Sequence, residues 1–281
     1  MPARTDIGYI RDLLSRHGFA FSKKLGQNFL INPSVCPRMA DAAVGGEEHV
    51  GVLEIGPGIG VLTRELAARA EYVCAVELDD RLPPVLAETL ADCGNVEIIQ
   101  GDAMKIDLDA LIGRRPDLTW VVCANLPYYI TSPLIMQLLE SRLNIRSLTV
   151  MVQKEAADRL CAAPGTRACG AVSLAVQYYA APQVLFGVSR GSFMPAPNVD
   201  SSVIRLDIRP TPPCTVKDEE QMFRLIRAAF GQRRKVLSNS LCGAGFDKER
   251  VAAALNAAGI SPTARAEQLT LAQFAALSDQ L

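Results

Sequence analysis

Short apolar runs alternate with segments of helical periodicity between residues 49 and 153. The runs are rich in β-branched residues and are predicted to be buried parallel strands: residues 49–55, 71–77, 95–99, 118–125 and 147–153. Three intervening segments have the spacing of helices: residues 61–70, 81–93 and 132–143. In the last, Ser132 before Pro133 is expected to be the N-cap. The alternation predicts a doubly wound, Rossmann-like α/β sheet.

The pattern changes after residue 170. A helical segment at 171–180 precedes two β-type runs, 181–189 and 200–208, and the ten residues between the runs include two prolines and a glycine. Such a connection suits an antiparallel pair rather than a crossover helix. The sheet is therefore predicted to end in an antiparallel hairpin.

A proline-rich stretch at 209–214 is the best domain boundary, because three prolines in six residues stop both helix and sheet. Beyond it, only helical spacing is found, at residues 219–241, 247–259 and 264–281. We predict a Rossmann-like domain over residues 1–209 and a small all-helical domain over residues 210–281.

Composition narrows the possible functions. The 281 residues carry a net charge of -1, so a nucleic-acid partner would have to be met by a local basic patch. No pair among the eight cysteines has the spacing of a zinc knuckle or redox motif, so no metal site is expected. The amino terminus lacks the apolar core of a signal peptide, and no 18 apolar residues run together. We expect a cytoplasmic protein without a membrane span.

A glycine-rich turn, Gly56-Pro57-Gly58-Ile59-Gly60, follows the first predicted strand. Glycines at a strand-to-helix turn let backbone N–H groups approach a ligand closely. A dinucleotide fingerprint would need its third glycine where Val61 stands, so no pyrophosphate site is predicted. A tight turn that binds nothing is the alternative interpretation of so short a motif.

Two carboxylates follow the next strands. Glu77 ends the second predicted strand, where it can accept hydrogen bonds from both hydroxyls of a ribose. Asp102 follows the third strand and is placed to accept from an adenine amino group. Either could be a solvated carboxylate at a strand end, but with Gly56 and Gly58 they describe a site for an adenosine-bearing cofactor without a pyrophosphate. S-adenosylmethionine meets that description.

The fourth predicted strand ends at Asn125-Leu126-Pro127-Tyr128. The Asn125 side-chain carbonyl and the Leu126 backbone carbonyl can accept both N–H bonds of an exocyclic amine, which frees the nitrogen lone pair for attack. Tyr128 can stack on the base. Phe193, expected to be exposed in the loop between the last two strands, is placed to clamp the base from the other side. A turn that Asn125 caps and Pro127 stiffens is the alternative.

The motifs together resemble one family. They are KKLGQNFL (23–30), LEIGPGIGVLT (53–63), VELD (76–79), GDAM (101–104), NLPYYITSP (125–133), MVQKE (151–155), FMPAPNVDSSV (193–203) and FGQRRKVLSNSL (230–241). In this order, over almost the whole chain, they resemble the bacterial small-subunit (16S) ribosomal RNA adenine N6-dimethyltransferases, the KsgA/RsmA family.

The resemblance implies a cofactor site, a base site and an activity. S-adenosylmethionine would be bound by Asn28, Leu30, Gly56, Glu77, Asp102 and Asn125. The target adenine would be held by residues 125–128 with Phe193 opposite, and we expect the segment over residues 1–32 to cover the cofactor. The implied reaction adds two methyl groups to each of two adjacent adenosines, in a hairpin loop near the 3′ end of the small-subunit RNA.

Basic residues are locally in excess at two places. From Phe223 to Gly245 there is no acid, and five residues are basic: Arg224, Arg227, Arg233, Arg234 and Lys235. Lys23 and Lys24 stand beside a glycine turn. We predict that both groups contact RNA phosphates, although a solvated face of an amphipathic helix is the alternative for the first.

Two other functions remain open from the sequence. One is methylation of large-subunit ribosomal RNA. The block at 230–241 argues against it, because this block resembles the small-subunit family. The other is a non-catalytic assembly or transcription factor that retains the fold. The complete glycine, acidic and NLPY motifs argue against it, because a site without catalytic use would be expected to decay. We expect a monomer whose partner is small-subunit ribosomal RNA within the immature small subunit.

Overall fold

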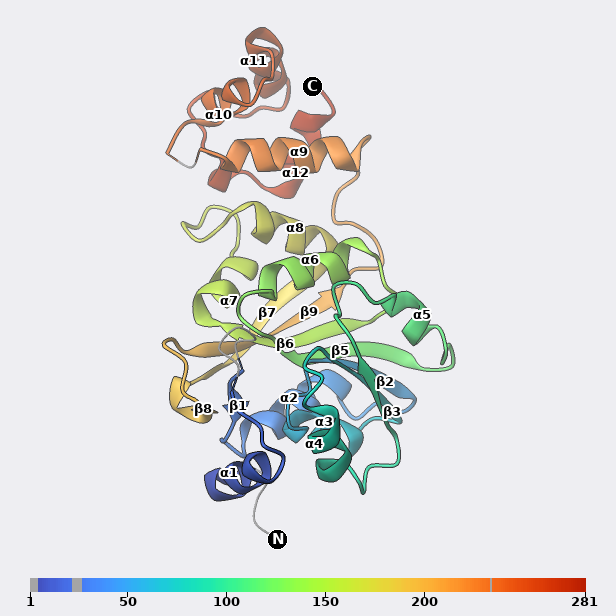
Figure 1. Ribbon diagram of the computed structural model, residues 1–281. Helices are drawn as coiled ribbons and strands as arrows, with labels where there is room; N and C mark the ends of the chain where they lie inside the picture. Colours follow the sequence, from blue (N-terminus) through green and yellow to red (C-terminus); the bar gives the residue numbers. More distant parts are fainter. Residues whose placement is uncertain (1–4, 22–26, 233) are drawn as a thin grey trace. The chain divides into compact units, whose positions relative to one another are not determined.

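The computed structural model describes residues 5–21, 27–232 and 234–281 (Figure 1). The chain divides into two compact units. Unit 1 combines the residues up to 157 with residues 183–208, and unit 2 combines residues 158–182 with residues 209–281. Each unit has its own hydrophobic core.

Unit 1 is built on a seven-stranded sheet with the order β4-β3-β2-β5-β6-β9-β7. The parallel strands are β2 (Val50–Ile55), β3 (Tyr72–Glu77), β4 (Val96–Gln100), β5 (Thr119–Asn125) and β6 (Ser147–Gln153). β9 (Ser201–Ile208) pairs antiparallel with β6, and β7 (Ala180–Val188) lies at the edge beside β9. Every residue of β2 is buried, as expected for a central strand covered on both faces. The predicted parallel strands and antiparallel edge are confirmed.

Helices precede and connect the strands: α1 (Ile7–Arg16), α2 (Val35–Val44), α3 (Val61–Ala67), α4 (Pro83–Thr89), α5 (Leu108–Ile112), α6 (Thr131–Glu140) and α7 (Lys154–Leu160). One core joins α2 and α3 to the sheet through Met39, Leu66 and Val121. A second core joins α1 to α4 through Ile10 and Leu86. Helix α1 is thereby packed against α4 within unit 1.

Helix α6 begins before its predicted N-cap. The N-cap is Ile130 rather than Ser132. The Ile130 N–H and the Thr131 hydroxyl both donate to the Pro127 carbonyl at 3.2 Å, so the turn after Pro127 already coils into the helix. Pro133 then occupies the third helical position, where no intrahelical N–H bond is lost.

A two-stranded ribbon, which the sequence did not predict, joins two distant segments. β1 (Phe29–Leu30) and β8 (Phe193–Met194) run antiparallel, with Phe29 opposite Met194 and Leu30 opposite Phe193. Strands of two residues are too short to show a period of two. The ribbon attaches the segment ahead of the sheet to the connection between β7 and β9.

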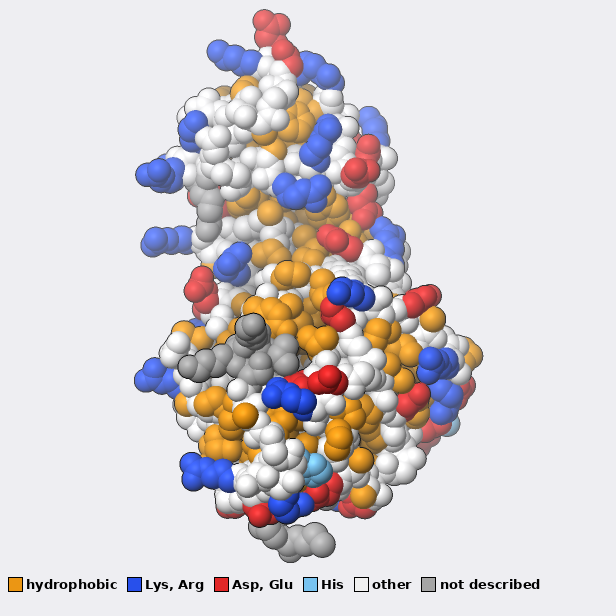
Figure 2. Space-filling model, viewed as in Figure 1, with side chains coloured by type: hydrophobic (Ala, Val, Ile, Leu, Met, Phe, Trp, Pro, Cys, Tyr) orange, Lys and Arg blue, Asp and Glu red, His pale blue; other side chains and the backbone are white. Residues whose placement is uncertain are grey.

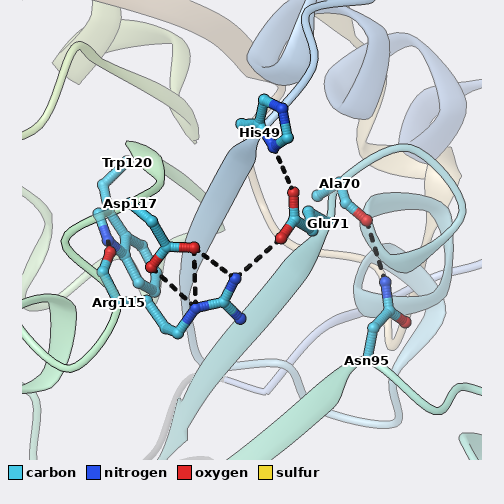
Figure 3. Close-up of polar contacts among 7 residues, drawn as sticks. All are labelled: His49, Ala70, Glu71, Asn95, Arg115, Asp117 and Trp120. Atoms are coloured by element: carbon cyan, nitrogen blue, oxygen red, sulfur yellow. Dashed lines mark hydrogen bonds and ion pairs between the residues drawn. The ribbon is translucent and has the colours of Figure 1, made fainter.

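Ion pairs gather at the amino ends of the central strands (Figure 3). Glu71 accepts from His49 Nδ1 and from Arg115 Nη2, each at 2.8 Å. Arg115 pairs with Asp117 at 2.7 Å, and its backbone carbonyl accepts from the Trp120 indole N–H at 3.0 Å. Exposed pairs of this kind add little stability individually, but they fix the starts of β2, β3 and β5. They lie at the sheet edge opposite the glycine turn.

Unit 2 is helical and contains α8 (Ala171–Tyr179), α9 (Glu219–Phe230), α10 (Leu237–Gly243), α11 (Lys248–Ala257) and α12 (Leu271–Ser278). Leu174 and Tyr178 of α8 are buried in one core with Met222 of α9 and Phe274 of α12. This packing groups residues 158–182 with the carboxyl-terminal helices. The predicted division at 209 differs from these units in placing that stretch with the sheet.

Candidate functional site

One cavity in unit 1 lies where the parallel strands end. Around it the structure brings together the predicted cofactor residues and the strand-end motif: Asn28, Leu30, Gly56, Gly58, Glu77, Asp102, Asn125, Leu126, Pro127 and Tyr128. They come from the ends of β2, β3, β4 and β5 and from the segment around β1. Carboxyl ends of parallel strands share one edge of a sheet, which is where open α/β folds bind ligands.

The glycine turn after β2 needs glycines for its backbone. Gly56, Gly58 and Gly60 have φ values of 71°, 60° and 83°, in the left-handed region that other residues rarely adopt. A Cβ on Gly56 would meet no atom within 4 Å, so this part of the turn faces open space. The turn therefore offers backbone close to the cavity, as a bound ligand would require.

Glu77 is held rigidly at the end of β3. Its Oε2 accepts from the Gly58 N–H at 3.2 Å, and its Oε1 accepts from the Asp79 N–H at 2.8 Å. The residue is 5% exposed, and burial raises the pKa of the carboxyl although both backbone bonds lower it. The carboxylate is thus fixed against the glycine turn with acceptor capacity left over.

Asp102 lies just beyond β4 and is less enclosed. Its Oδ1 accepts from the Met104 N–H at 3.0 Å, and Lys105 Nζ lies 3.6 Å from its Oδ2. Tyr129 also lines the cavity, and burial together with the charges of Asp102 and Glu77 raises the pKa of its phenol. The two carboxylates and Tyr129 therefore lie close to one another.

The NLPY motif is anchored by bonds that leave its acceptors available. Asn125 Nδ2 donates to the Asn28 carbonyl at 3.5 Å, which leaves Asn125 Oδ1 as an acceptor. The Leu126 N–H donates to the Met151 carbonyl at 3.1 Å. The Tyr128 hydroxyl is bonded to Ser201 Oγ at 3.0 Å, and burial raises the pKa of the phenol. The Tyr128 ring is held from β9, a strand far along the chain.

Phe193 does not occupy the exposed position predicted for it. Its side chain is 3% exposed and packs in the core of unit 1 with Leu30, Val188 and Val203. The cause is the β1–β8 ribbon, which sets Phe193 opposite Leu30. Leu30 lines the cavity and Phe193 does not, and the expectation that Phe193 is exposed is wrong.

The predicted basic residues fall into two groups. Lys23, Lys24 and Arg233 lie outside the described residues. Arg224, Arg227, Arg234 and Lys235 are exposed on unit 2, the first two on α9. Figure 2 shows Lys and Arg side chains at several places on the visible face of this unit, with Asp and Glu among them.

A hollow in unit 2 is lined by two arginines that are not among the basic residues predicted from the sequence. Arg167 and Arg265 line it together with Arg234 and Glu267. The Gly165 N–H donates to the Glu267 carbonyl at 2.6 Å and joins the two distant stretches of chain. Isolated arginines separated by about a hundred residues leave no local signal, so only the fold could bring them together.

Sequence reasoning also missed Glu54, the last residue but one of β2, which lines the cavity. The side chain is 1% exposed, its Oε2 has no hydrogen-bond partner, and burial raises the pKa of the carboxyl to about 8. An acid within a buried apolar strand is unusual, and this was the signal in the sequence.

Two features are absent from the described parts of the chain. No group of three or more His, Cys, Asp or Glu side chains there is arranged to hold a metal ion. No helix there combines the length and apolar character needed to cross a bilayer.

The sheet order and the strand-end cavity define the class of Rossmann-like methyltransferases. A sequence profile of the ribosomal RNA adenine dimethylases matches residues 18–281, and the chain belongs to this family. It is 50% identical over 280 residues to ribosomal RNA small subunit methyltransferase A of Geobacillus thermodenitrificans, covering 98% of this chain and 95% of that protein. The protein of the same name from Streptococcus pneumoniae is 46% identical over 282 residues, covering 98% and 97%.

Solved structures agree with this assignment. A dimethyladenosine transferase from Plasmodium falciparum superposes with a TM-score of 0.74 at 26% identity, covering 89% of this chain and 95% of that one. The 23S rRNA methyltransferase ErmE superposes with a TM-score of 0.68 at 29% identity, covering 90% and 99%. The likeness therefore extends across both units.

Proposed function

We infer that this protein is an S-adenosylmethionine-dependent adenine N6-dimethyltransferase of small-subunit ribosomal RNA. The observation that carries the inference is the single cavity shared by the glycine turn, two strand-end carboxylates and the NLPY motif. The two relatives, which are 46–50% identical to this chain over nearly their full length, are named small subunit methyltransferases.

The cavity residues fit S-adenosylmethionine. The glycine turn faces open space, and Glu77 is held ready to accept from ribose hydroxyls. Asp102 can accept from the adenine amino group, and Ile59 and Leu78 add apolar lining for the flat base. When bound, the cofactor supplies a methyl group on a positively charged sulfur.

The residues of the NLPY motif hold the acceptor nitrogen. With its amide nitrogen bonded to Asn28, Asn125 presents Oδ1 to one N–H of the target adenine. The Leu126 carbonyl accepts the other, so the nitrogen lone pair points away from both bonds. Tyr128, held through Ser201, stacks on the base. This is catalysis by positioning and charge complementarity.

The finer assignment concerns the RNA. We assign the methylation to two adjacent adenosines in a hairpin loop near the 3′ end, in an immature small subunit that a monomeric enzyme meets in the cytoplasm. The basic residues of unit 2, with Lys23 and Lys24, contact phosphates of that RNA. Because enzymes that act on a base take it from a loop or flip it out, a splayed adenine is the expected form of the substrate.

The deciding experiment is methyl transfer from radiolabelled S-adenosylmethionine to three substrates: unmethylated small subunits, large subunits and naked small-subunit RNA. We expect label in the small subunits, recovered as N6,N6-dimethyladenosine. Label in large subunits alone would support the specificity that the name of ErmE indicates. No label in any substrate, with cofactor binding intact, would support a non-catalytic assembly factor.

A further inference from the structure

Asp79 is a buried carboxylate in exposed surroundings. It lies two residues beyond β3, between Leu78, which is 45% exposed, and the exposed Asp80. Its own side chain is only 3% exposed. A charged group in such a place requires partners that replace water.

Arg81 and Gln27 are those partners. Arg81 grips the carboxylate with two bonds, Nε to Oδ1 at 2.8 Å and Nη2 to Oδ2 at 2.6 Å, and its backbone N–H adds a third at 3.1 Å. Gln27 Nε2 donates to Oδ2 at 2.7 Å from a position 52 residues earlier. The Arg81 guanidinium, ahead of the other partners, holds the pKa of Asp79 below its usual range, so the group stays charged at neutral pH.

The same residue touches the predicted cofactor carboxylate. The backbone N–H of Asp79 donates to Glu77 Oε1 at 2.8 Å. On the other side, Gln27 precedes Asn28, whose carbonyl accepts from Asn125 Nδ2. Asp79 therefore stands between Glu77 and the segment that carries Asn28.

Arg81 extends this attachment to residues before position 22. Its Nη1 donates to the Ala20 carbonyl at 3.1 Å, and its guanidinium lies 4.6 Å from the centre of the Phe19 ring. Phe19 in turn contacts Phe29, with ring centres 6.1 Å apart. Asp79 and Arg81 together thus contact three described residues of the amino-terminal chain: Phe19, Ala20 and Gln27.

We propose that Asp79, gripped by Arg81, is a positioning residue for S-adenosylmethionine. It does not line the cavity. It fixes Glu77 through its backbone and Gln27 through its side chain, and so aligns the two walls that would enclose the cofactor. The proposal rests on the cofactor assignment made above.

The test compares Asp79→Asn with Asp80→Asn in the full-length protein. Each change removes one negative charge and keeps the size of the side chain. Of the two aspartates, only Asp79 accepts a hydrogen bond from Gln27. Binding of S-adenosylmethionine and S-adenosylhomocysteine is measured by calorimetry without RNA. We expect Asp79→Asn to raise both dissociation constants about tenfold or more, and Asp80→Asn to leave them within about twofold of the unmodified protein.

Two readouts separate positioning from general stability. In steady-state methylation, Asp79→Asn should raise KM for the cofactor by about tenfold while kcat changes by less than about threefold. In a double-mutant cycle, Gln27→Ala should add little to the loss in Asp79→Ala, because each change removes the bond from Gln27 Nε2 to Asp79 Oδ2. If Asp79→Asn folds poorly, Arg81→Lys, which keeps the charge and loses the two-bond grip, should show a smaller loss of the same kind.

Each result decides between distinct conclusions. If the unmodified protein binds the cofactor and Asp79→Asn binds it equally well, this inference is wrong and the proposed function stands. Additive losses in the cycle would also overturn it, since Asp79 would then act independently of Gln27. If the unmodified protein binds no S-adenosylmethionine, the proposed function fails and the inference fails with it.

Discussion

Replacement of Glu54 by glutamine should remove a loss of stability that the unmodified protein shows as pH rises. Glu54 lies within β2, is 1% exposed, and has one carboxyl oxygen without a hydrogen-bond partner. Burial raises its pKa from 4.5 to about 8, and the nearby charge of Glu77 acts in the same direction while Thr63 opposes it. In the folded protein the carboxyl is therefore protonated through most of the neutral range.

The sign follows from proton binding in the two states. Between pH 4.5 and about 8 the unfolded chain has lost this proton and the folded protein keeps it, so stability falls as pH rises. Each pH unit in this window is worth up to about 1.4 kcal/mol. From pH 5 to pH 8 the group should thus remove up to about 4 kcal/mol of stability.

In Glu54→Gln that slope is absent, because the amide does not titrate. The variant buries an N–H pair where the carboxyl has an oxygen without a partner, which we expect to cost roughly 1–3 kcal/mol at every pH. The variant should therefore be less stable than the unmodified protein at pH 5 and more stable above pH 8. The two curves of stability against pH should cross.

Urea unfolding at a series of pH values provides the assay. Trp120 is the single tryptophan and is buried in β5, so its fluorescence reports on unit 1. Glu155→Gln, an exposed change on α7, serves as the control and should run parallel to the unmodified protein. Parallel curves for Glu54→Gln as well would show that Glu54 is already ionised in the folded state and would refute this reasoning.

Three further outcomes can be checked with the same protein. Glu77→Ala should weaken S-adenosylmethionine binding at least about tenfold in calorimetry, because charge-assisted bonds of about 1.5–3 kcal/mol each are lost; unchanged affinity would remove Glu77 from the site. Asn125→Ala should slow methyl transfer in single turnover far more than it weakens subunit binding, because its carbonyl acts as charge develops; transfer at the unmodified rate would leave it a structural cap. Phe193→Ala should lower the free energy of unfolding by about 3–5 kcal/mol in urea, since it empties a core position; a loss below about 1 kcal/mol would contradict its burial.

Features that depend on local periodicity could be predicted. The parallel strands agree with prediction to within one residue at each end, because mostly apolar, β-branched runs stand out from the polar segments that bound them. The convergence of Gly56, Glu77, Asp102 and Asn125 followed from topology alone, since each stands where a parallel strand ends. No knowledge of side-chain packing was needed for either.

Features that depend on contacts between distant segments could not be predicted from the sequence. Gln27 meets Asp79 across 52 residues, and Tyr128 meets Ser201 across 73. The domain boundary predicted at residues 209–214 places residues 158–182 with the sheet, yet their apolar side chains pack with α9. Such pairings have no periodicity to detect, because both partners are ordinary polar or apolar residues until the fold brings them together.

Phe193 lies away from the cavity, but its contacts connect it to residues that line the cavity. The sequence predicts contact with the base because a large apolar residue in an exposed loop needs a binding role, but Phe193 is buried and that premise does not hold. Its partner across the ribbon is Leu30, which lines the cavity and follows Asn28 by two residues. Because the Asn28 carbonyl also accepts from Asn125, we expect a change in the packing of Phe193 to reach the Asn125 amide through β1, and we propose that this amide holds the target nitrogen. Loss of activity in a Phe193 variant is therefore evidence for contact with the base only if Leu30 and the stability of unit 1 are unchanged.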